Sequence, residues 1–352
     1  MKIIHAIYSF TVGGAETMLV DIINQQCKEA SVSLIVVNED FNINLLNTIN
    51  KNVNIFLINR KESNKIQLIS AFLMINKIVS KINPDVIHCH DTRLFPFFIR
   101  RKRITCLTVH GINLSVAFLK QYRQVFAISV AVQQNIKNRS GVNAQIVFNG
   151  IEINQYKSRI NYKFEPKKDE FKIVQVSRLS AAKGQEAAIK AISLLKERNS
   201  NLNIKLYFVG GGDILTNLKE MSIKYSVKDQ IIFAGTVDRQ WIKSNLANFH
   251  LLIQPSLIEG FGLTVIEGFA AGLPVIASKL DGPEEICKLL DAGLLVRAND
   301  PADLAEKINS VYQSYISDSL NNNNYILKDK NKLSIFDIQT TAKTYINNYF
   351  FD

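Results

Sequence analysis

Short apolar runs rich in β-branched residues alternate with longer amphipathic stretches along most of the 352-residue chain. Each apolar run is typical of a buried strand, and each amphipathic stretch has the spacing of a helix with one apolar face. The expected strands are 2–8, 33–37, 53–57, 86–88, 104–109, 125–128 and 145–148, followed by 173–177, 204–209, 230–234, 251–254, 275–277 and 293–296. Strands that alternate with helices predict an α/β fold with doubly wound parallel sheets.

A polar segment interrupts this alternation between residues 163 and 172 and contains Pro166. Such a break between two βα series is typical of a linker between domains. We therefore expect an N-terminal domain over residues 1–165 and a C-terminal domain over residues 166–333. The final stretch has apolar residues at helical spacing, which predicts a closing helix over residues 334–352 that packs back on the N-terminal domain.

Charge is divided unevenly between the two expected domains. The formal net charge of the chain is +11. Residues 1–150 hold 17 Lys and Arg against 8 Asp and Glu, a net charge of +9, whereas residues 151–352 hold 25 against 23, a net charge of +2. This asymmetry indicates an anionic partner for the N-terminal half, either a membrane surface or a nucleic acid. We favour the membrane, because no motif for binding RNA or DNA accompanies the charge.

A phenylalanine-rich segment from Leu94 to Ile99 runs directly into four cations. Exposed aromatic side chains beside clustered cations suit insertion at an anionic lipid surface. The expected membrane contact consists of Phe97, Phe98, Arg100, Arg101, Lys102 and Arg103. A buried helix with a basic end explains this segment equally well.

Other features limit the classes of protein. The four cysteines include no CxxC pair, so we expect neither a disulfide framework nor a thiolate zinc site. No uninterrupted run of about 20 apolar residues predicts a membrane span, and the N-terminus lacks the pattern of a secretory signal. We expect a cytoplasmic protein, peripheral at the inner face of the cell membrane. The segment from His88 to Asp91 has metal-binding residue types, but nothing else completes a shell, so we expect no metal.

Glycines and cations follow the first strand of each series, where α/β folds often hold phosphate groups. Gly13 and Gly14 precede a predicted helix, whose N-terminus favours anions, although a tight turn alone would also use them. Arg178 and Lys183 follow the first strand of the second series and could together neutralise a diphosphate, or lie in a solvated loop. His110 ends a strand and could donate a hydrogen bond into a cleft, or be a satisfied histidine at the edge of the core.

The segment over residues 254–278 contains two carboxylates eight positions apart, Glu259 and Glu267. Gly260 and Gly262 lie between them and open a loop whose amides can face a ligand. Paired carboxylates serve glycoside hydrolysis when they flank one bond, which a single loop and helix achieve poorly. The pair is better placed to accept hydrogen bonds from sugar hydroxyls. Purely structural roles for both residues remain open.

The string from Pro255 to Ser278 resembles the EX7E signature of retaining glycosyltransferases of family 4. Further matches in the family's order are Gly13-Gly14-Ala15-Glu16, His110-Gly111, Ile128-Ser129, Asn149-Gly150-Ile151, Ser177-Arg178-Leu179, Lys183-Gly184, 209–212 and 293–296. The resemblance spans residues 1 to about 300. It implies the GT-B architecture, in which two Rossmann-like domains enclose a site in the cleft between them. One departure is Gly268, where many relatives have alanine, which places a flexible residue early in the helix.

The resemblance also implies a role for individual residues. Arg178 and Lys183 would bind the donor's diphosphate and stabilise the charge that develops on it, without a metal. Glu267 would hold the ribose, and His110 would lie beside the sugar from the opposite domain. The remaining implied contacts are Gly14 to the phosphate, Thr236 and Val237 to the nucleobase, and Glu259 with the backbone of Phe261, Gly262, Leu263 and Thr264 to the donor sugar.

The implied activity is that of a retaining, metal-independent hexosyltransferase (EC 2.4). It would move a hexose or N-acetylhexosamine from a nucleotide sugar, a UDP-sugar favoured over a GDP-sugar, to a lipid-linked saccharide or oligosaccharide in bacterial surface polysaccharide or lipopolysaccharide biosynthesis. No cofactor and no nucleic acid partner are expected. The alternatives are a nucleotide-sugar 2-epimerase of the same architecture, for which we locate no acid and base around C2, and a non-catalytic GT-B partner subunit.

Overall fold

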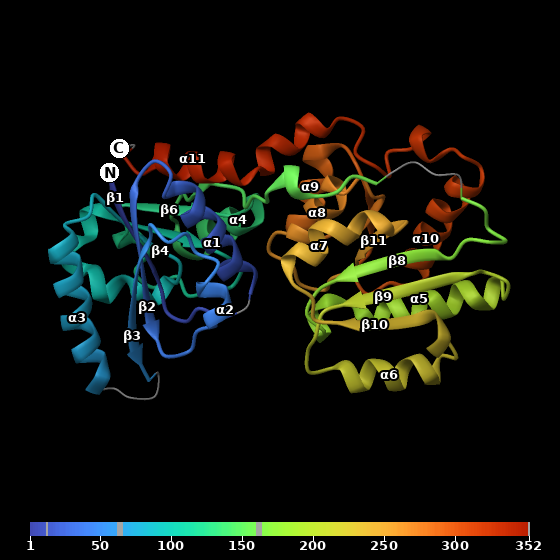
Figure 1. Ribbon diagram of the computed structural model, residues 1–352, viewed down its shortest axis with the longest axis horizontal. Helices are drawn as coiled ribbons and strands as arrows, with labels where there is room; N and C mark the ends of the chain where they lie inside the picture. The colour runs from blue at the N-terminus through green and yellow to red at the C-terminus, as the bar shows by residue number, and fades with distance from the viewer. Residues whose placement is uncertain (12, 62–65, 160–163, 351–352) are drawn as a thin grey trace. The chain divides into compact units, whose positions relative to one another are not determined.

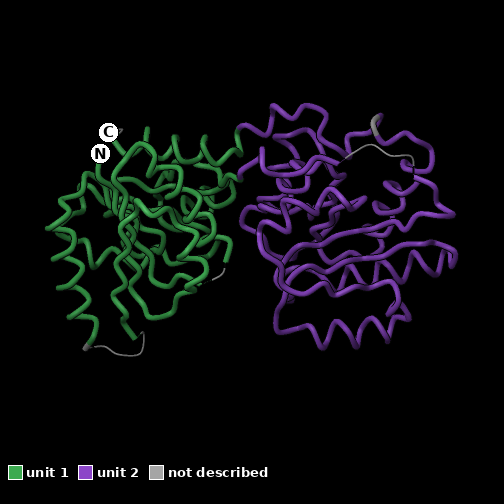
Figure 2. The backbone as a smooth tube through the Cα atoms, in the orientation of Figure 1, with its two compact units in different colours: residues 1–151, 335–352 green, residues 152–334 purple. Residues whose placement is uncertain are grey.

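The structure is a computed structural model that describes residues 1–11, 13–61, 66–159 and 164–350. The chain forms two compact units (Figure 2): unit 1 contains residues 1–151 and 335–352, and unit 2 contains residues 152–334. Lys163 of the expected linker and the last two residues of the expected closing helix lie outside the described residues.

Unit 1 is built on a seven-stranded parallel sheet in the order β3-β2-β1-β4-β5-β6-β7. Its strands are β1 (Lys2–Ile7), β2 (Ser31–Asn38), β3 (Asn54–Arg60), β4 (Val86–Cys89), β5 (Thr105–Val109), β6 (Gln124–Ala127) and β7 (Gln145–Ile146). Its helices are α1 (Gly14–Gln26), α2 (Ile43–Leu46), α3 (Ile66–Ile82), η1 (Thr92–Ile104), η2 (Leu119–Gln121), α4 (Val130–Ser140) and α11 (Ile338–Asn348). The central strands are almost wholly buried, because helices cover both faces of the sheet.

Unit 2 contains a six-stranded parallel sheet in the order β10-β9-β8-β11-β12-β13. Its strands are β8 (Phe171–Val176), β9 (Ile204–Val209), β10 (Ile231–Gly235), β11 (Leu251–Gln254), β12 (Val275–Ser278) and β13 (Leu294–Val296). The α-helices are α5 (Gln185–Arg198), α6 (Leu215–Lys224), α7 (Arg239–Asn245), α8 (Leu263–Ala270), α9 (Asp281–Leu290) and α10 (Pro301–Ile316), accompanied by short 3₁₀ turns at η3 (Ile153–Gln155), η4 (Ala181–Lys183), η5 (Lys228–Gln230), η6 (Leu246–Asn248) and η7 (Leu320–Asn322). The turn η8 (Lys330–Phe336) begins in unit 2 and ends in unit 1.

Each unit therefore has the doubly wound, Rossmann-like arrangement that the alternating pattern predicts, and the fold class is confirmed (Figure 1). Every expected strand has a counterpart within a few residues. In both sheets the chain winds first to one side of its first strand and then to the other. The strand order consequently reverses between β1 and β4 in unit 1 and between β8 and β11 in unit 2.

The boundary between the units differs from the expected division at residue 165. Ile151 bridges to Asp337 in unit 1, and its amide donates to the carbonyl of Phe336 over 2.9 Å. The amide of Lys157 instead donates to the carbonyl of Lys243 in unit 2 over 3.0 Å. The crossing lies at residues 151–152 because these backbone hydrogen bonds, rather than the polar composition after residue 162, fix where each segment packs.

The C-terminal segment returns to unit 1, where α11 packs against α1 (Figure 1). Tyr345 and Tyr349 of this segment are fully buried. Gly150 permits the close approach, since a Cβ there would lie 2.5 Å from the hydroxyl of Thr341. The last helix is thus part of the core of unit 1.

Candidate functional site

The two strands that flank the reversal in unit 2 are followed by the cations and carboxylates that the sequence singled out. Strand β8 leads into the loop that contains Arg178 and Lys183, and the neighbouring strand β11 leads into the loop that contains Glu259. In open α/β sheets the loops at such a reversal leave on opposite sides and form a crevice at the carboxyl ends of the strands. Ligands bind there in folds of this kind.

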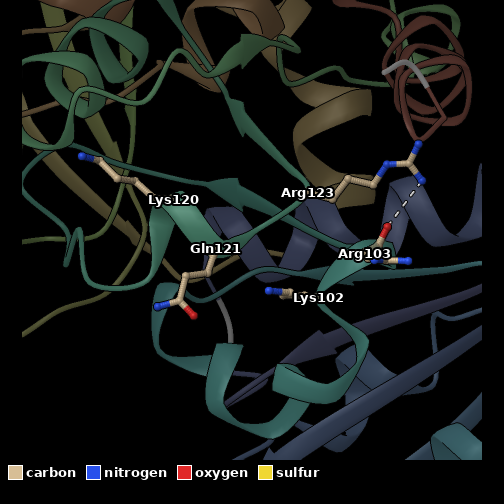
Figure 3. A pocket seen from close by; sticks show the side chains of 5 residues that line it. All are labelled: Lys102, Arg103, Lys120, Gln121 and Arg123. Carbon is tan, nitrogen blue, oxygen red and sulfur yellow. Dashed lines mark hydrogen bonds between the residues drawn. The ribbon is translucent and has the colours of Figure 1, made fainter.

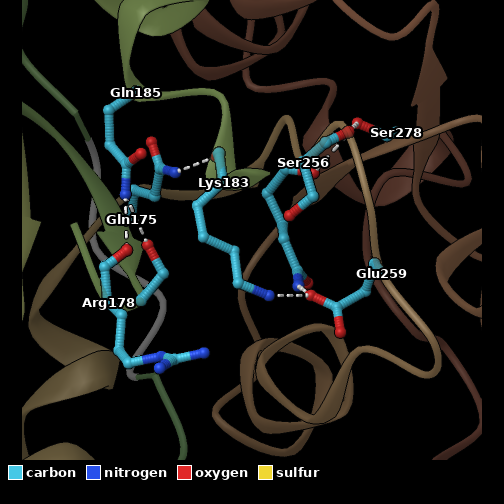
Figure 4. A network of polar contacts seen from close by, with 9 residues as sticks. Gln175, Arg178, Lys183, Gln185, Ser256, Glu259 and Ser278 are labelled. Carbon is cyan, nitrogen blue, oxygen red and sulfur yellow. Dashed lines mark hydrogen bonds and ion pairs between the residues drawn. The ribbon is translucent and has the colours of Figure 1, made fainter. Parts of the chain in front are cut away.

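An ion pair joins these two loops. The Lys183 Nζ lies 2.7 Å from Glu259 Oε2 (Figure 4). The same oxygen accepts a hydrogen bond from Gln254 Nε2 over 2.8 Å. The side chains of Lys183 and Glu259 are only 21% and 16% exposed. A pair with so little water around it attracts more strongly than one on an open surface. The interaction holds the ammonium group at the carboxyl edge of the sheet.

The loop that carries Lys183 is fixed from both sides. Gln175 Nε2 donates to the carbonyl of Lys183 over 2.7 Å, and Gln185 Nε2 donates to the carbonyl of Arg178 over 2.8 Å (Figure 4). Gly184 has φ +70°, and a Cβ at this position would lie 1.8 Å from the carbonyl oxygen of Pro255. Only glycine allows these two backbones to approach so closely. The loop geometry is therefore set before any ligand binds.

A pocket of about 360 Å³ opens beside Arg178 at the ends of β8, β9 and β10. Its lining consists of Val176, Ser177, Arg178, Val209, Gly210, Gly211, Gly212, Thr236, Val237 and Ile242. Gly210 has φ +140°, and a Cβ there would lie 2.0 Å from the carbonyl oxygen of Ser177. Among the described residues, the exposed guanidinium of Arg178 has no acidic partner. The small cavity is therefore lined by an exposed cation, Arg178, that could bind an anionic ligand.

Helix α8 places the second carboxylate. The helix begins at Leu263, after Gly262 with φ +107°, so the amides of its first turn point toward the loop of Glu259. Glu267 Oε1 accepts a hydrogen bond from the hydroxyl of Tyr156 over 2.8 Å. Phe261 is buried, and among the described residues the buried hydroxyl of Thr264 has no hydrogen-bond partner. The predicted sugar and ribose contacts therefore lie on one loop and one helix.

In unit 1 the corresponding strands carry a cluster of buried histidines. His5 lies on β1, His88 lies on β4, and His90 follows β4. One nitrogen from each of these rings lies within 4.8 Å of the others, a spacing that could hold a metal ion. Their six ring nitrogens, however, all have hydrogen-bond partners, so a metal would have to displace several of those bonds.

His88 and His90 lie next to each other in this cluster. The two residues are separated by two positions, so both side chains lie on one face of the sheet, and their ring centroids are 4.3 Å apart. His5 joins them because β1 pairs with β4 in register, with His5 opposite His88. The strand order, which the sequence does not reveal directly, brings the three rings together.

Burial keeps these rings neutral. It lowers the pKa of His5 to about 4, against the opposing effect of the hydrogen bond to Gln26. It also lowers the pKa of His110 to about 4, with Asp91 acting in the opposite direction. For His88 and His90, burial and the neighbouring histidines lower the pKa well below its ordinary value. At neutral pH the cluster is therefore a hydrogen-bonding network without charge.

The other predicted residues of unit 1 are placed as follows. Gly14 is exposed at the first position of α1, where a Cβ would meet nothing within 4 Å. His110 follows β5, its Nε2 lies 3.0 Å from His90 Nδ1, and its buried Nδ1 has no partner among the described residues. The structure thus links His110 to the buried histidines.

Two family models match the chain on either side of residue 156. The model described as Glycosyltransferase Family 4 matches residues 12–155, and the model described as Glycosyl transferases group 1 matches residues 157–326. Together they take in both units. The chain is a glycosyltransferase of this family. Its two Rossmann-like units form the GT-B fold that the resemblance predicts.

Named relatives and solved structures agree with the family that the two models indicate. An uncharacterized glycosyltransferase of Methanocaldococcus jannaschii is 27% identical over 66% of this chain and 67% of its own length. The gpi3 subunit of phosphatidylinositol N-acetylglucosaminyltransferase from Schizosaccharomyces pombe is 24% identical over 78% of this chain and 64% of its own length. The crystal structure of Anabaena HepE in complex with UDP and glucose has a TM-score of 0.76 and 21% identity, covering 99% of this chain and 98% of that one.

Two phenylalanines that we expected to be exposed at a membrane are buried in this glycosyltransferase. Phe97 and Phe98 are 2% and 1% exposed, because η1 turns both rings into the core of unit 1. The prediction that they contact a membrane is therefore wrong. The prediction was based on aromatic residues beside clustered cations, a local pattern that does not reveal which side chains pack inward.

Two of the four cations of that segment, Lys102 and Arg103, form part of a basic pocket of about 700 Å³. It is lined by Lys102, Arg103, Lys120, Gln121 and Arg123 (Figure 3). Lys120 and Arg123 were not predicted, because they follow the next strand of the sequence and approach Arg103 only through the order of the sheet. Within the described residues, no helix combines the length and apolar character needed to cross a membrane.

Several supporting residues of the glycosyltransferase were also missed. Gln254 holds Glu259, Tyr156 holds Glu267, and Gln26 holds His5. Glutamines carry no charge and occur throughout the chain, so only their buried positions at strand and helix ends could have singled them out. Tyr156 lies just past the junction of the units, in a stretch without any periodic pattern.

Proposed function

We propose that this glycosyltransferase transfers a hexose or N-acetylhexosamine from a UDP-sugar to a lipid-linked saccharide, with retention of anomeric configuration and without a metal ion. The observation that carries the proposal is the Lys183–Glu259 ion pair, held beside Arg178 where the strand order reverses. Two cations at that edge suit a diphosphate, and the adjacent carboxylates suit sugar hydroxyls.

Arg178 and Lys183 act on the leaving group. As the bond between the sugar C1 and the β-phosphate oxygen breaks, negative charge grows on the diphosphate, and two fixed cations stabilise that charge most strongly at the transition state. The acceptor oxygen forms the new bond to C1. Its proton passes to the departing phosphate oxygen on the same face of the sugar, which yields retention without a carboxylate nucleophile.

The remaining residues of unit 2 position the donor. Glu267, fixed by Tyr156, accepts hydrogen bonds from the ribose hydroxyls. The pocket of about 360 Å³ holds the base against the backbone of Thr236 and Val237. Glu259 and the first turn of α8 contact the sugar. Because Gln254 and Lys183 both contact Oε2 of Glu259, its Oε1 can accept a hydrogen bond from a sugar hydroxyl. From unit 1, Gly14 adds an amide to the phosphates and His110 meets the transferred sugar.

A lipid-linked acceptor in bacterial surface polysaccharide or lipopolysaccharide biosynthesis fits the charge of unit 1. The basic pocket around Arg103 and the excess of cations in residues 1–150 favour an anionic membrane surface. The enzyme is then a peripheral protein at the cytoplasmic face of the cell membrane. The relative from Schizosaccharomyces pombe, by its name, acts on phosphatidylinositol, which is also a lipid acceptor.

Calorimetric titration with UDP, GDP, ADP, CMP and TDP in EDTA tests the donor site. We expect micromolar binding of UDP that disappears in Arg178→Ala/Lys183→Ala. The matched control is Arg198→Ala/Lys219→Ala, which removes one exposed Arg and one exposed Lys elsewhere in unit 2. Equal binding by both double variants, or binding that requires a divalent metal, would reject the proposed diphosphate site.

A further inference from the structure

A continuous chain of hydrogen bonds runs from His110 into the core of unit 1. His110 Nε2 lies 3.0 Å from His90 Nδ1, and His90 Nε2 lies 2.9 Å from His5 Nδ1. The chain ends where His5 Nε2 lies 2.8 Å from Gln26 Oε1. His5, His90 and Gln26 are all buried, so bulk water does not compete for these bonds.

The donor and acceptor of every hydrogen bond in this chain follow from its last member, Gln26. An amide oxygen only accepts, so the proton of neutral His5 must lie on Nε2, toward Gln26. His5 Nδ1 is then an acceptor, and His90 must donate to it from Nε2. His90 Nδ1 is in turn an acceptor, and His110 must donate from Nε2. Because a neutral imidazole carries one proton, His110 Nδ1 is left with a lone pair.

A second arm of the network fixes the orientation of the Gln26 amide. Thr108 Oγ1 donates to the hydroxyl of Tyr345 over 3.1 Å, so it must accept from His88 Nε2, which lies 2.7 Å away. His88 Nδ1 therefore accepts from the hydroxyl of Tyr349 over 2.9 Å. Because the Tyr349 hydroxyl donates its only proton to His88, it accepts a hydrogen bond from Gln26 Nε2 over 3.1 Å. The amide nitrogen faces Tyr349, and the amide oxygen consequently faces His5.

We propose that Gln26, acting through His5 and His90, holds His110 in the neutral tautomer that carries its proton on Nε2 and offers Nδ1 as a hydrogen-bond acceptor to a sugar hydroxyl. The role of His110 in sugar transfer rests on the proposed function. The position of His110 at a strand end suggested a hydrogen-bond donor toward a ligand, whereas the network assigns an acceptor, Nδ1, at that position. Gln26, His5 and His90 are positioning residues, since they act only through His110.

The buried state of His110 Nδ1 supports this assignment. Among the described residues this atom has no hydrogen-bond partner, although nearly all buried polar atoms in proteins have one. An acceptor at this position gains most from a ligand that brings a hydroxyl proton. The lowered pKa of His110, caused by burial, keeps that lone pair free of a proton at neutral pH.

Long-range ¹H–¹⁵N spectra of histidine-labelled protein test the tautomer directly, because protonated and unprotonated ring nitrogens resonate apart. In the unaltered protein we expect His110 with its proton on Nε2. Gln26→Met should shift the population toward Nδ1–H, whereas Gln25→Met on the same helix should not. A proton on Nδ1 of His110 in the unaltered protein would overturn the proposal, whatever the variants do.

Kinetics with a UDP-sugar supply a second readout. Gln26→Met should lower kcat roughly 10- to 100-fold, as loss of partners that orient a catalytic group does elsewhere, and leave UDP affinity unchanged. Gln26→Glu retains an acceptor toward His5 and should restore much of kcat. A chain without transferase activity would reject the proposed function and still leave the tautomer measurable. An altered kcat with an unaltered tautomer would reject the positioning role.

Discussion

Units 1 and 2 present corresponding strand ends, those of β1 and β4 in one sheet and those of β8 and β11 in the other. Unit 2 places an ion pair and an exposed arginine there, whereas unit 1 places neutral, buried histidines joined by hydrogen bonds. The same topology thus supports opposite chemistry. Charge at the end of β8 suits a ligand that is already anionic, and a neutral network with fixed proton positions suits hydroxyl groups, which both donate and accept.

The largest expected effect comes from removing charge in unit 2. Lys183→Ala should lower kcat/KM about 10³-fold, because a fixed donor at the developing charge contributes most at the transition state. Steady-state kinetics with a UDP-sugar and a membrane lipid extract as acceptor measure the change. Arg198→Ala, an exposed cation of the same unit, is the control. Unchanged turnover in Lys183→Ala would refute the role assigned to the ammonium group.

The basic pocket of unit 1 gives the next largest effect. Lys102→Glu/Arg103→Glu/Lys120→Glu should weaken binding to anionic vesicles roughly 100-fold, since each cation near such a surface contributes about 1 kcal/mol. Sedimentation with phosphatidylserine vesicles measures it. The control Lys167→Glu/Arg198→Glu/Lys219→Glu reverses as many exposed cations of unit 2. Equal loss in both variants would indicate a response to net charge only.

The basic pocket shows where sequence reasoning succeeds and fails. The strands, the loop opened by Gly260 and Gly262 and the loop of Arg178 could be predicted, because apolar periodicity and glycine spacing are local properties. Lys120 beside Arg103 could not be predicted, and neither could His5 beside His88, because both neighbourhoods depend on the lateral order of strands. Phe97 and Phe98 were placed wrongly because burial is set by packing partners that the local pattern does not contain.

The next prediction concerns the stability of the two units in acid. A histidine with a lowered folded pKa binds fewer protons than its unfolded form, so its contribution to stability is lost as the pH falls below about 6.5. For His5, whose folded pKa is about 4, the loss at pH 5 amounts to about 2 kcal/mol in the free energy of unfolding.

Unit 1 holds four such histidines and unit 2 holds one, His250, whose pKa burial also lowers to about 4. Hydrogen exchange of both units at pH 7.5 and pH 5, corrected for intrinsic rates, should therefore show a greater loss of protection in unit 1. A greater loss in unit 2 would contradict the assignment of neutral histidines to unit 1. Replacing His5 with Gln, which cannot gain a proton, should reduce the difference.

The smallest effect concerns the carboxylate that faces Lys183. Glu259→Gln removes the charge that the ammonium group now balances, and the amide retains nearly the same shape. We expect UDP to bind up to about tenfold more tightly, because Lys183 no longer has to leave a partner in order to meet the phosphates, while turnover falls as the sugar loses its acceptor. Calorimetry for UDP and kinetics for the UDP-sugar separate the two consequences. Weaker UDP binding would mean that Glu259 positions Lys183 for the diphosphate rather than competing with the diphosphate for it. Unit 2 would then resemble unit 1 in holding its polar groups in place before a ligand binds, and the two units would differ only in the charge of those groups.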